Sequence, residues 1–181
     1  MKMKIMRRTF FWCALVMLAA GAIARAATTM RIVPIVRDQS LVITVELSDG
    51  YTAEVRDAIA SGLRTTFTYD VDVRMVVPAW VDRTVSTTVV GMSDHYDNLT
   101  RRHSLSRLID GRVEEALVTN DEAIVKKWLT SLNGLAVCPT SKLDPNRDYY
   151  VRISASVRPP GASLLGWANA ITNQAKFTFI P

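Results

Sequence analysis

The chain has 181 residues, with 22 Lys and Arg against 17 Asp and Glu, so its formal net charge is +5. Five of the basic residues lie in residues 1–26, which hold no acidic residue, and this leaves 17 basic against 17 acidic residues in residues 27–181. A formally neutral domain lacks the broad positive surface that nucleic acids bind, so we expect no nucleic-acid partner.

Residues 1–26 have the pattern of a secretory signal peptide. A basic start precedes the apolar run Thr9–Ala24, and Ala24-Arg25-Ala26 has the small-x-small spacing that signal peptidase reads, which predicts a mature chain starting at Ala27. The alternative is a retained N-terminal anchor, although the apolar run of about 16 residues is shorter than the roughly 20 that span a bilayer as a helix. We therefore predict an exported protein that contacts the membrane only through an uncleaved leader.

Residues 27–181 are predicted to form one domain, in which apolar residues recur mostly at every second position, as in β-strands. The clearest case is Thr65–Val77, where the odd-numbered residues from Phe67 onward are apolar or aromatic and the even-numbered ones are mostly polar. One face of this strand should be buried and the other solvated, as in an antiparallel sheet. The predicted strands in chain order are Met30–Val36, Leu41–Leu47, Thr65–Val77, Thr84–Tyr96, Ser104–Ile109, Val113–Val118, Tyr149–Val157 and Ala175–Phe179.

Two segments have helical spacing instead. The first is Thr52–Ser61, with Ser48 or Asp49 as the predicted N-cap, and the second is Asn120–Leu132, capped by its own first residue and ended by Asn133-Gly134. Strands and helices together predict a mainly β fold. We expect an antiparallel β-sandwich of about seven or eight strands, with two short helices at its ends or edge.

Cys138 is the one cysteine in residues 27–181, so these residues cannot form an intramolecular disulfide. The apolar run Leu135-Ala136-Val137 in front of it favours a small apolar filler in the protein interior. The alternative is a reactive or intermolecular thiol.

Three stretches of the chain resemble one protein family. They are Asp57–Leu63, Tyr96–Leu105 and Leu143–Arg152, and the most specific is the Tyr-x-x-Leu-Thr-Arg-Arg segment that begins at Tyr96. On these stretches the chain resembles the DUF4390 family, small exported proteins of Gram-negative bacteria without an assigned activity. The resemblance implies a periplasmic location and supplies no catalytic residues. It also suggests a role in envelope signalling, because family members are often encoded beside a membrane sensor kinase of a two-component system.

One cluster of residues has the types that ligate metals. Asp94, His95, Asp97 and His103 could share an ion only if the chain turned near Asn98, because a continuous strand would hold its ends too far apart. The alternative is a set of polar residues that end a strand and begin a turn, which is the interpretation we adopt.

Two carboxylates have a spacing that is found in catalysis. Asp70 and Asp72 would lie about 6.6 Å apart on one face of a strand, a separation typical of inverting glycosidases. An exposed strand with Arg74 as a neutralising neighbour has the same pattern, and the sequence contains neither a nucleophile-elbow motif nor a phosphate-binding glycine loop. We therefore predict a non-catalytic protein without a cofactor or a metal.

A cluster of cations is the first candidate for binding. Arg101, Arg102, His103 and Arg107 place four potential cations within seven residues of a neutral domain, and arginine suits carboxylates and phosphates. Adjacent arginines on a strand point to opposite faces, so one of Arg101 and Arg102 should reach a given ligand. The alternative, which is the interpretation we favour, is a structural network across neighbouring strands, in which the other of Arg101 and Arg102 pairs with Asp94, Asp97 or Glu114.

Two tryptophans are the second candidates for binding. Trp80 follows Pro78 in a predicted loop and Trp167 lies in a segment flanked by glycines, so both could be exposed anchors for a partner. Trp128, on the apolar stripe of the second helix, is predicted to lie in the core.

We predict a non-catalytic cell-envelope protein that acts by protein–protein interaction, with a membrane sensor kinase as a candidate partner. The alternative is a periplasmic binder or carrier of an apolar or amphiphilic ligand. That ligand would lie between the sheets, with helix Asn120–Leu132 as a lid and the arginines as a headgroup clamp. An envelope hydrolase that uses Asp70 and Asp72, or the His95 cluster, is the third interpretation.

Overall fold

A computed structural model of the chain describes residues 29–158 and 170–180. The predicted cleavage residues Ala24, Ala26 and Ala27, and the candidate anchor Trp167, lie outside the described residues. Within these residues the fold is mostly β, with two α-helices and two antiparallel sheets, as predicted. No helix in residues 29–158 and 170–180 is long and apolar enough to cross a membrane.

The two sheets contain three and six strands. The smaller has the order β1-β2-β7 and the larger β6-β5-β4-β3-β8-β9, with every neighbouring pair antiparallel. The strands of the smaller sheet are β1 (Thr29–Arg37), β2 (Ser40–Ser48) and β7 (Ser131–Pro139). The strands of the larger sheet are β3 (Thr65–Met75), β4 (Arg83–Asp97), β5 (Arg102–Ile109), β6 (Arg112–Thr119), β8 (Asp148–Arg158) and β9 (Ile171–Thr178). The helices are α2 (Ala53–Ala60), α3 (Glu122–Thr130) and a short 3-10 helix, η1 (Thr140–Lys142).

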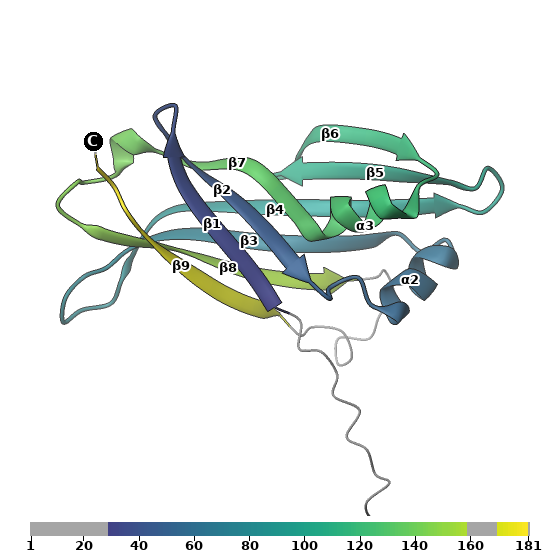
Figure 1. The fold of residues 1–181 in the computed structure, drawn as a ribbon, viewed down its shortest axis with the longest axis horizontal. Coiled ribbons are helices and arrows are strands. Elements are labelled where there is room, and N and C mark those ends of the chain that lie inside the picture. The colour runs from purple at the N-terminus through teal and green to yellow at the C-terminus, as the bar shows by residue number, and fades with distance from the viewer. Residues whose placement is uncertain (1–28, 159–169, 181) are drawn as a thin grey trace, which may run out of the picture.

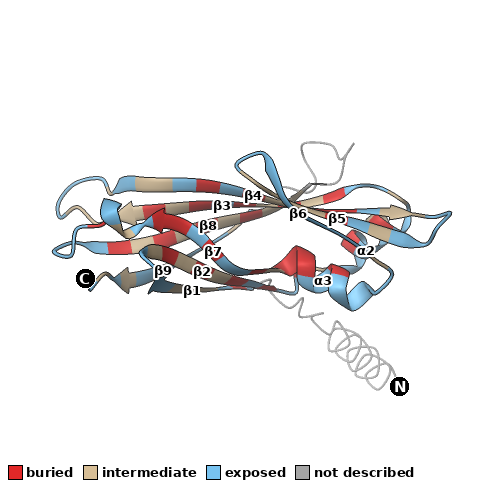
Figure 2. Ribbon diagram, turned by 90° about the horizontal axis from the view of Figure 1, so that it is seen from above, coloured by how far each residue is buried: buried red, intermediate tan, exposed pale blue. Residues whose placement is uncertain are grey.

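The core lies between the larger sheet and a second layer of mixed composition. At one end that layer is the three-stranded sheet, and at the other it is α2 and α3, which cover the same face of the larger sheet (Figures 1 and 2). On one side the two sheets meet where β1 lies beside β9, and the Asn173 side chain donates a hydrogen bond to the Met30 carbonyl there. The helices therefore complete the core where the smaller sheet ends.

Alternation along β3 places its apolar side chains in this core. Phe67, Tyr69, Val71 and Val73 are fully buried, which confirms the predicted face. The Tyr69 hydroxyl donates a hydrogen bond to the Leu129 carbonyl at 2.7 Å and so ties α3 to the middle of the larger sheet. Burying the phenol without this bond would cost the free energy of its desolvation.

The structure differs from the sequence prediction at β7, which raises the number of described strands to nine. Asn133-Gly134 was expected to end the second helix, but α3 ends at Thr130 and the chain continues directly into β7. Gly134 has a φ of +69° and lies where the β2–β7 register shifts, between Ile43 and Val45. A glycine there fits a β-bulge, which is the second common role of an isolated glycine in an apolar run.

The helix caps also differ from the prediction. Thr52 caps α2 by accepting a hydrogen bond from the Val55 amide at 3.3 Å, whereas Ser48 is still in β2. Asp121, rather than Asn120, caps α3 by accepting from the Ala123 amide at 2.8 Å. In both cases a side-chain oxygen satisfies a backbone donor of the first helical turn.

Candidate functional site

The turn between β4 and β5 brings the candidate cations into position. Asp97 organises it: its carboxylate accepts hydrogen bonds from the Leu99 amide and the Thr100 hydroxyl, both at 2.8 Å. The Leu99 amide and the Thr100 hydroxyl also hold the pKa of Asp97 below its usual value. Arg101 closes the turn with a φ of +55°, and its amide donates to the Asp97 carbonyl at 2.8 Å. Asp97 is therefore a structural residue of the turn.

After the turn, His103 lies opposite Tyr96 and reaches back to Asp94. Its Nδ1 is 2.8 Å from Asp94 Oδ2, and the two side chains are 12% and 0% exposed. Burial raises the pKa of Asp94, while the hydrogen bond and the charge of His103 act in the opposite direction. The Tyr96 ring lies against the imidazole, with 4.6 Å between the ring centroids. His103 is therefore fixed in orientation by a carboxylate on one side and a ring on the other.

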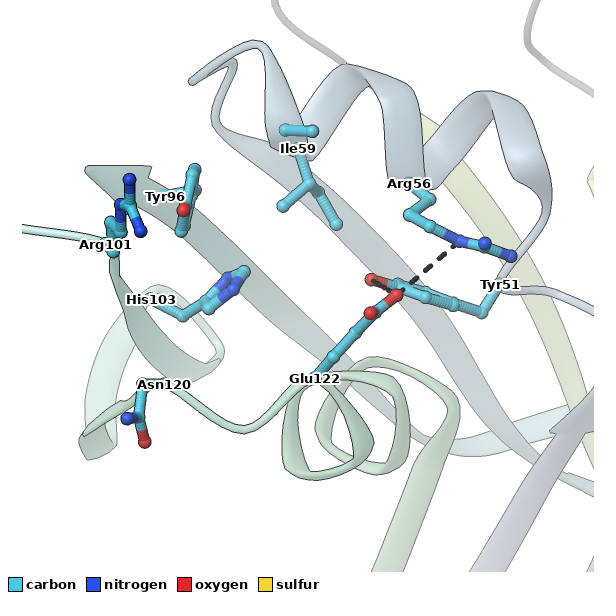
Figure 3. Close-up of a pocket in the computed structure, with 9 residues that line it drawn as sticks. Tyr51, Arg56, Ile59, Tyr96, Arg101, His103, Asn120 and Glu122 are labelled. Carbon is cyan, nitrogen blue, oxygen red and sulfur yellow. Dashed lines mark hydrogen bonds and ion pairs between the residues drawn. The ribbon is translucent and has the colours of Figure 1, made fainter. Parts of the chain in front are cut away.

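A cavity of about 490 Å³ opens in front of His103, between α2, the end of β4 and the start of α3 (Figure 3). We call it the helix-end cavity, and its labelled lining residues are Tyr51, Arg56, Ile59, Tyr96, Arg101, His103, Asn120 and Glu122. Its volume lies within the range of about 300–1,000 Å³ that is common for small-molecule sites.

The wall of the helix-end cavity opposite His103 is a polar cluster. Glu122 accepts a hydrogen bond from the Tyr51 hydroxyl at 3.5 Å and pairs with Arg56 Nε at 3.5 Å. Burial, followed by the charge of Glu122, raises the pKa of Tyr51 to about 12, so the phenol stays protonated near neutral pH. Sequence reasoning missed Tyr51 and Arg56. Arg56, Ile59 and Ala60 share the i, i+3, i+4 spacing of one helix face, which was the available signal.

The predicted cationic patch is divided by the fold. Arg101 and His103 line the helix-end cavity, whereas Arg102 is exposed at the start of β5 and does not line it. Arg107 lies over the Trp128 ring, 4.7 Å from its centroid, and pairs with Glu115 at 2.9 Å. Ion pairs therefore form at Arg107 and at the Asp94–His103 pair, whereas the predicted pairing of Arg101 or Arg102 with Asp94, Asp97 or Glu114 is not found among the described residues.

The loop between β3 and β4 presents Trp80, whose side chain is 81% exposed. The loop is braced at Asp82, whose carboxylate accepts from the Tyr150 hydroxyl at 2.8 Å and from the Val77 amide at 3.2 Å. These bonds, with that of Tyr150 the stronger influence, lower the pKa of Asp82. Arg74 donates to the Asp82 carbonyl at 3.0 Å, and the Trp80 amide donates to the Val77 carbonyl at 3.2 Å. The indole is thus held out to solvent by a loop of defined shape.

A second cavity, of about 500 Å³, lies at the base of this loop, and we call it the loop-base cavity. Met75 and Arg83, which flank the loop, line it together with Lys142, Asp144 and Arg147 from the η1 region. Three cations face one carboxylate there, and Arg147 pairs with Asp144 at 4.0 Å. Among its lining residues the loop-base cavity therefore carries more cations than carboxylates.

The contacts of the remaining candidate residues indicate structural roles. Asp72 pairs with Arg152 at 2.7 Å and accepts from Thr87 at 2.9 Å, so its neutralising partner is Arg152 and not the predicted Arg74. Cys138 is buried, as the prediction of an interior filler requires, and burial raises the pKa of its thiol. Across residues 29–158 and 170–180, no three His, Cys, Asp or Glu side chains are grouped closely enough to hold a metal ion.

Comparison with known proteins gives a family and no activity. Residues 24–160, well over half of the chain, match the model of the domain of unknown function DUF4390, so the chain belongs to this family. No curated protein and no solved structure matches the chain.

Proposed function

We propose that this member of the DUF4390 family is a non-catalytic cell-envelope protein that acts by binding another protein through the Trp80 loop. The observation that carries the proposal is an 81% exposed tryptophan on a loop that four hydrogen bonds hold in shape. Truncation of tryptophans at interfaces often costs more than 2 kcal/mol of binding free energy, and a rigid loop loses little conformational entropy on binding.

The charge beside the loop indicates the chemistry of the partner. The loop-base cavity presents Arg83, Lys142 and Arg147 at the base of the loop that carries the exposed indole. A partner segment that combines an apolar pocket with acidic side chains would match both features, because opposite charges at an interface speed association and favour the correct partner. A membrane sensor kinase of the envelope is the partner class that we propose.

The alternative of an apolar ligand between the sheets has less support. Helix α3 buries Val125, Trp128 and Leu129 against the larger sheet, so the space beneath the proposed lid is filled with side chains. The two cavities described above lie at the surface.

Replacing Trp80 by alanine should abolish partner capture without affecting folding. After cross-linking in cells at native expression, the wild-type chain should retain one recurrent protein partner, identified by mass spectrometry. With purified partner, Trp80→Ala should weaken binding about tenfold or more, as expected for a hot-spot residue. Its thermal unfolding should match that of the wild type, because an exposed side chain leaves no cavity when it is truncated.

Leu99→Ala is the matched control, because Leu99 is 95% exposed in the β4–β5 turn, at the other end of β4 (Figure 1). This variant should bind the partner as the wild type does. Equal loss in both variants, full binding by Trp80→Ala, or the absence of any recurrent protein partner would contradict the proposal.

A further inference from the structure

We propose that the helix-end cavity is a second binding site, which takes a small organic anion. The carboxylate or phosphate of the ligand would lie against Arg101 and His103, and its apolar body against Ile59 and Tyr96. This site is separate from the Trp80 loop, since the two lie at opposite ends of β4.

The balance of charge in the helix-end cavity favours an anion. The lining contains two arginines, Arg56 and Arg101, and one carboxylate, that of Glu122. Arg56 is already paired with Glu122. No ion pair joins the Arg101 side chain to another residue in the part of the chain that the structure describes. An unpaired guanidinium at the wall of a cavity can bind a carboxylate or phosphate through two parallel hydrogen bonds.

His103 supplies a second group for the same anion. Its ring points into the cavity (Figure 3), and Nδ1 is engaged by Asp94, which leaves Nε2 for a ligand. In the imidazolium form both ring nitrogens are donors, so Nε2 can donate to an oxyanion while the Asp94 carboxylate accepts from Nδ1. Asp94 and Tyr96 hold the ring in place, so the donor is oriented before a ligand arrives.

The size and the remaining lining call for an organic ligand. A cavity of about 490 Å³ is much larger than a phosphate ion. Ile59 and Ala60 of α2 and the Tyr96 ring of β4 add apolar and aromatic surface next to the two cations. A ligand with an anionic end and a flat apolar body would use both kinds of surface.

Four probes test this site by isothermal titration calorimetry on the purified chain: phenyl phosphate, benzoate, inorganic phosphate and benzyl alcohol. Phenyl phosphate or benzoate should bind at millimolar concentration or below, inorganic phosphate more weakly, and benzyl alcohol not measurably. Arg101→Gln should weaken binding of the organic anion about tenfold or more, since charge-assisted hydrogen bonds are lost. Arg102→Gln is the matched control, one residue away and outside the cavity, and should change the affinity less than twofold.

The two histidines of the chain provide a readout that does not depend on the variants. Phenyl phosphate should shift the imidazole resonances of His103 in NMR spectra and leave those of His95, which is exposed and does not line the cavity, unchanged. Equal effects of Arg101→Gln and Arg102→Gln, equal binding of benzyl alcohol, failure of both organic anions to bind, or an unmoved His103 signal would overturn the proposal. Trp80→Ala should keep full affinity for phenyl phosphate, so failure of one proposal is distinguishable from failure of the other.

Discussion

Replacing His103 by alanine should lower the free energy of unfolding by about 3–5 kcal/mol near neutral pH, which is the usual effect of leaving a buried carboxylate without its compensating partner. Asp94 has no exposed surface, and its Oδ1 has no hydrogen-bond partner among the described residues. Without His103, Oδ2 also loses its partner at 2.8 Å, and the carboxylate must stay buried without compensation or take up a proton. Urea unfolding of both chains measures the difference.

A second substitution distinguishes this cause from a loss of packing. Asp94→Asn removes the charge that His103 compensates, so in the His103→Ala background it should recover about 2 kcal/mol of the loss. Thr65→Ser offers a control in the same background, because Thr65 lies opposite Asp94 in the β3–β4 register and is also buried. It should recover nothing. A loss that Asp94→Asn leaves untouched would show that His103 acts by packing alone.

The pH dependence of this loss has a definite sign. Burial raises the pKa of Asp94 above its ordinary value of 3.8, so the folded state holds a proton that the unfolded chain has already released. The stability that this proton contributes is fully present below pH 3.8 and is lost as the pH rises through the raised pKa. Removing His103 removes two influences that lower this pKa, so the window extends upward. The effect of His103→Ala should therefore be smaller at a pH just above 3.8 than near neutral pH.

Strand alternation made most of the fold predictable. The buried face of β3 follows from period two alone, because a shift of one residue would move Phe67 and Tyr69 into solvent. Strand β7 was not predicted because Asn133-Gly134 is typical both of a helix end and of a β-bulge. Pairing with β2 decides between the two, and this pairing is a tertiary contact. The number of strands was therefore underestimated although the architecture was correct.

The candidate site was predictable only in part, because it joins segments far apart in the chain. Arg101 and His103 could be selected from their charge and spacing, but Arg56 and Tyr51 reach them through the packing of α2. The sequence prediction also treated the four cations as one group, although the fold gives them different roles. Residues 103, 105 and 107 share one face of β5, and α3 covers the Arg107 end of that face while the His103 end stays open to the cavity. The position of the neighbouring helix α3 decides which of these cations has a structural role. The spacing of residues along β5 gives no information about where that helix lies.

Trp128→Ala should cost about 3–5 kcal/mol of unfolding free energy, the range found when a large aromatic side chain is removed from a core. Trp128 is 8% exposed, lies on the buried stripe of α3 and carries the Arg107 guanidinium over its ring at 4.7 Å. Truncation would leave a cavity between α3 and β5 and would end the cation–π contact, which contributes about 0.5–2 kcal/mol within that total. Thermal or urea unfolding measures the loss.

Trp80→Ala is the matched control in the same chain, because it removes the same side chain from an 81% exposed position and should leave the unfolding free energy unchanged within about 0.5 kcal/mol. A similar large loss in both variants would contradict the free anchor role of Trp80, and a similarly small loss in both would contradict the core role of Trp128. A large loss confined to Trp128→Ala would show that burial, and not the loss of an indole as such, sets the cost in unfolding free energy.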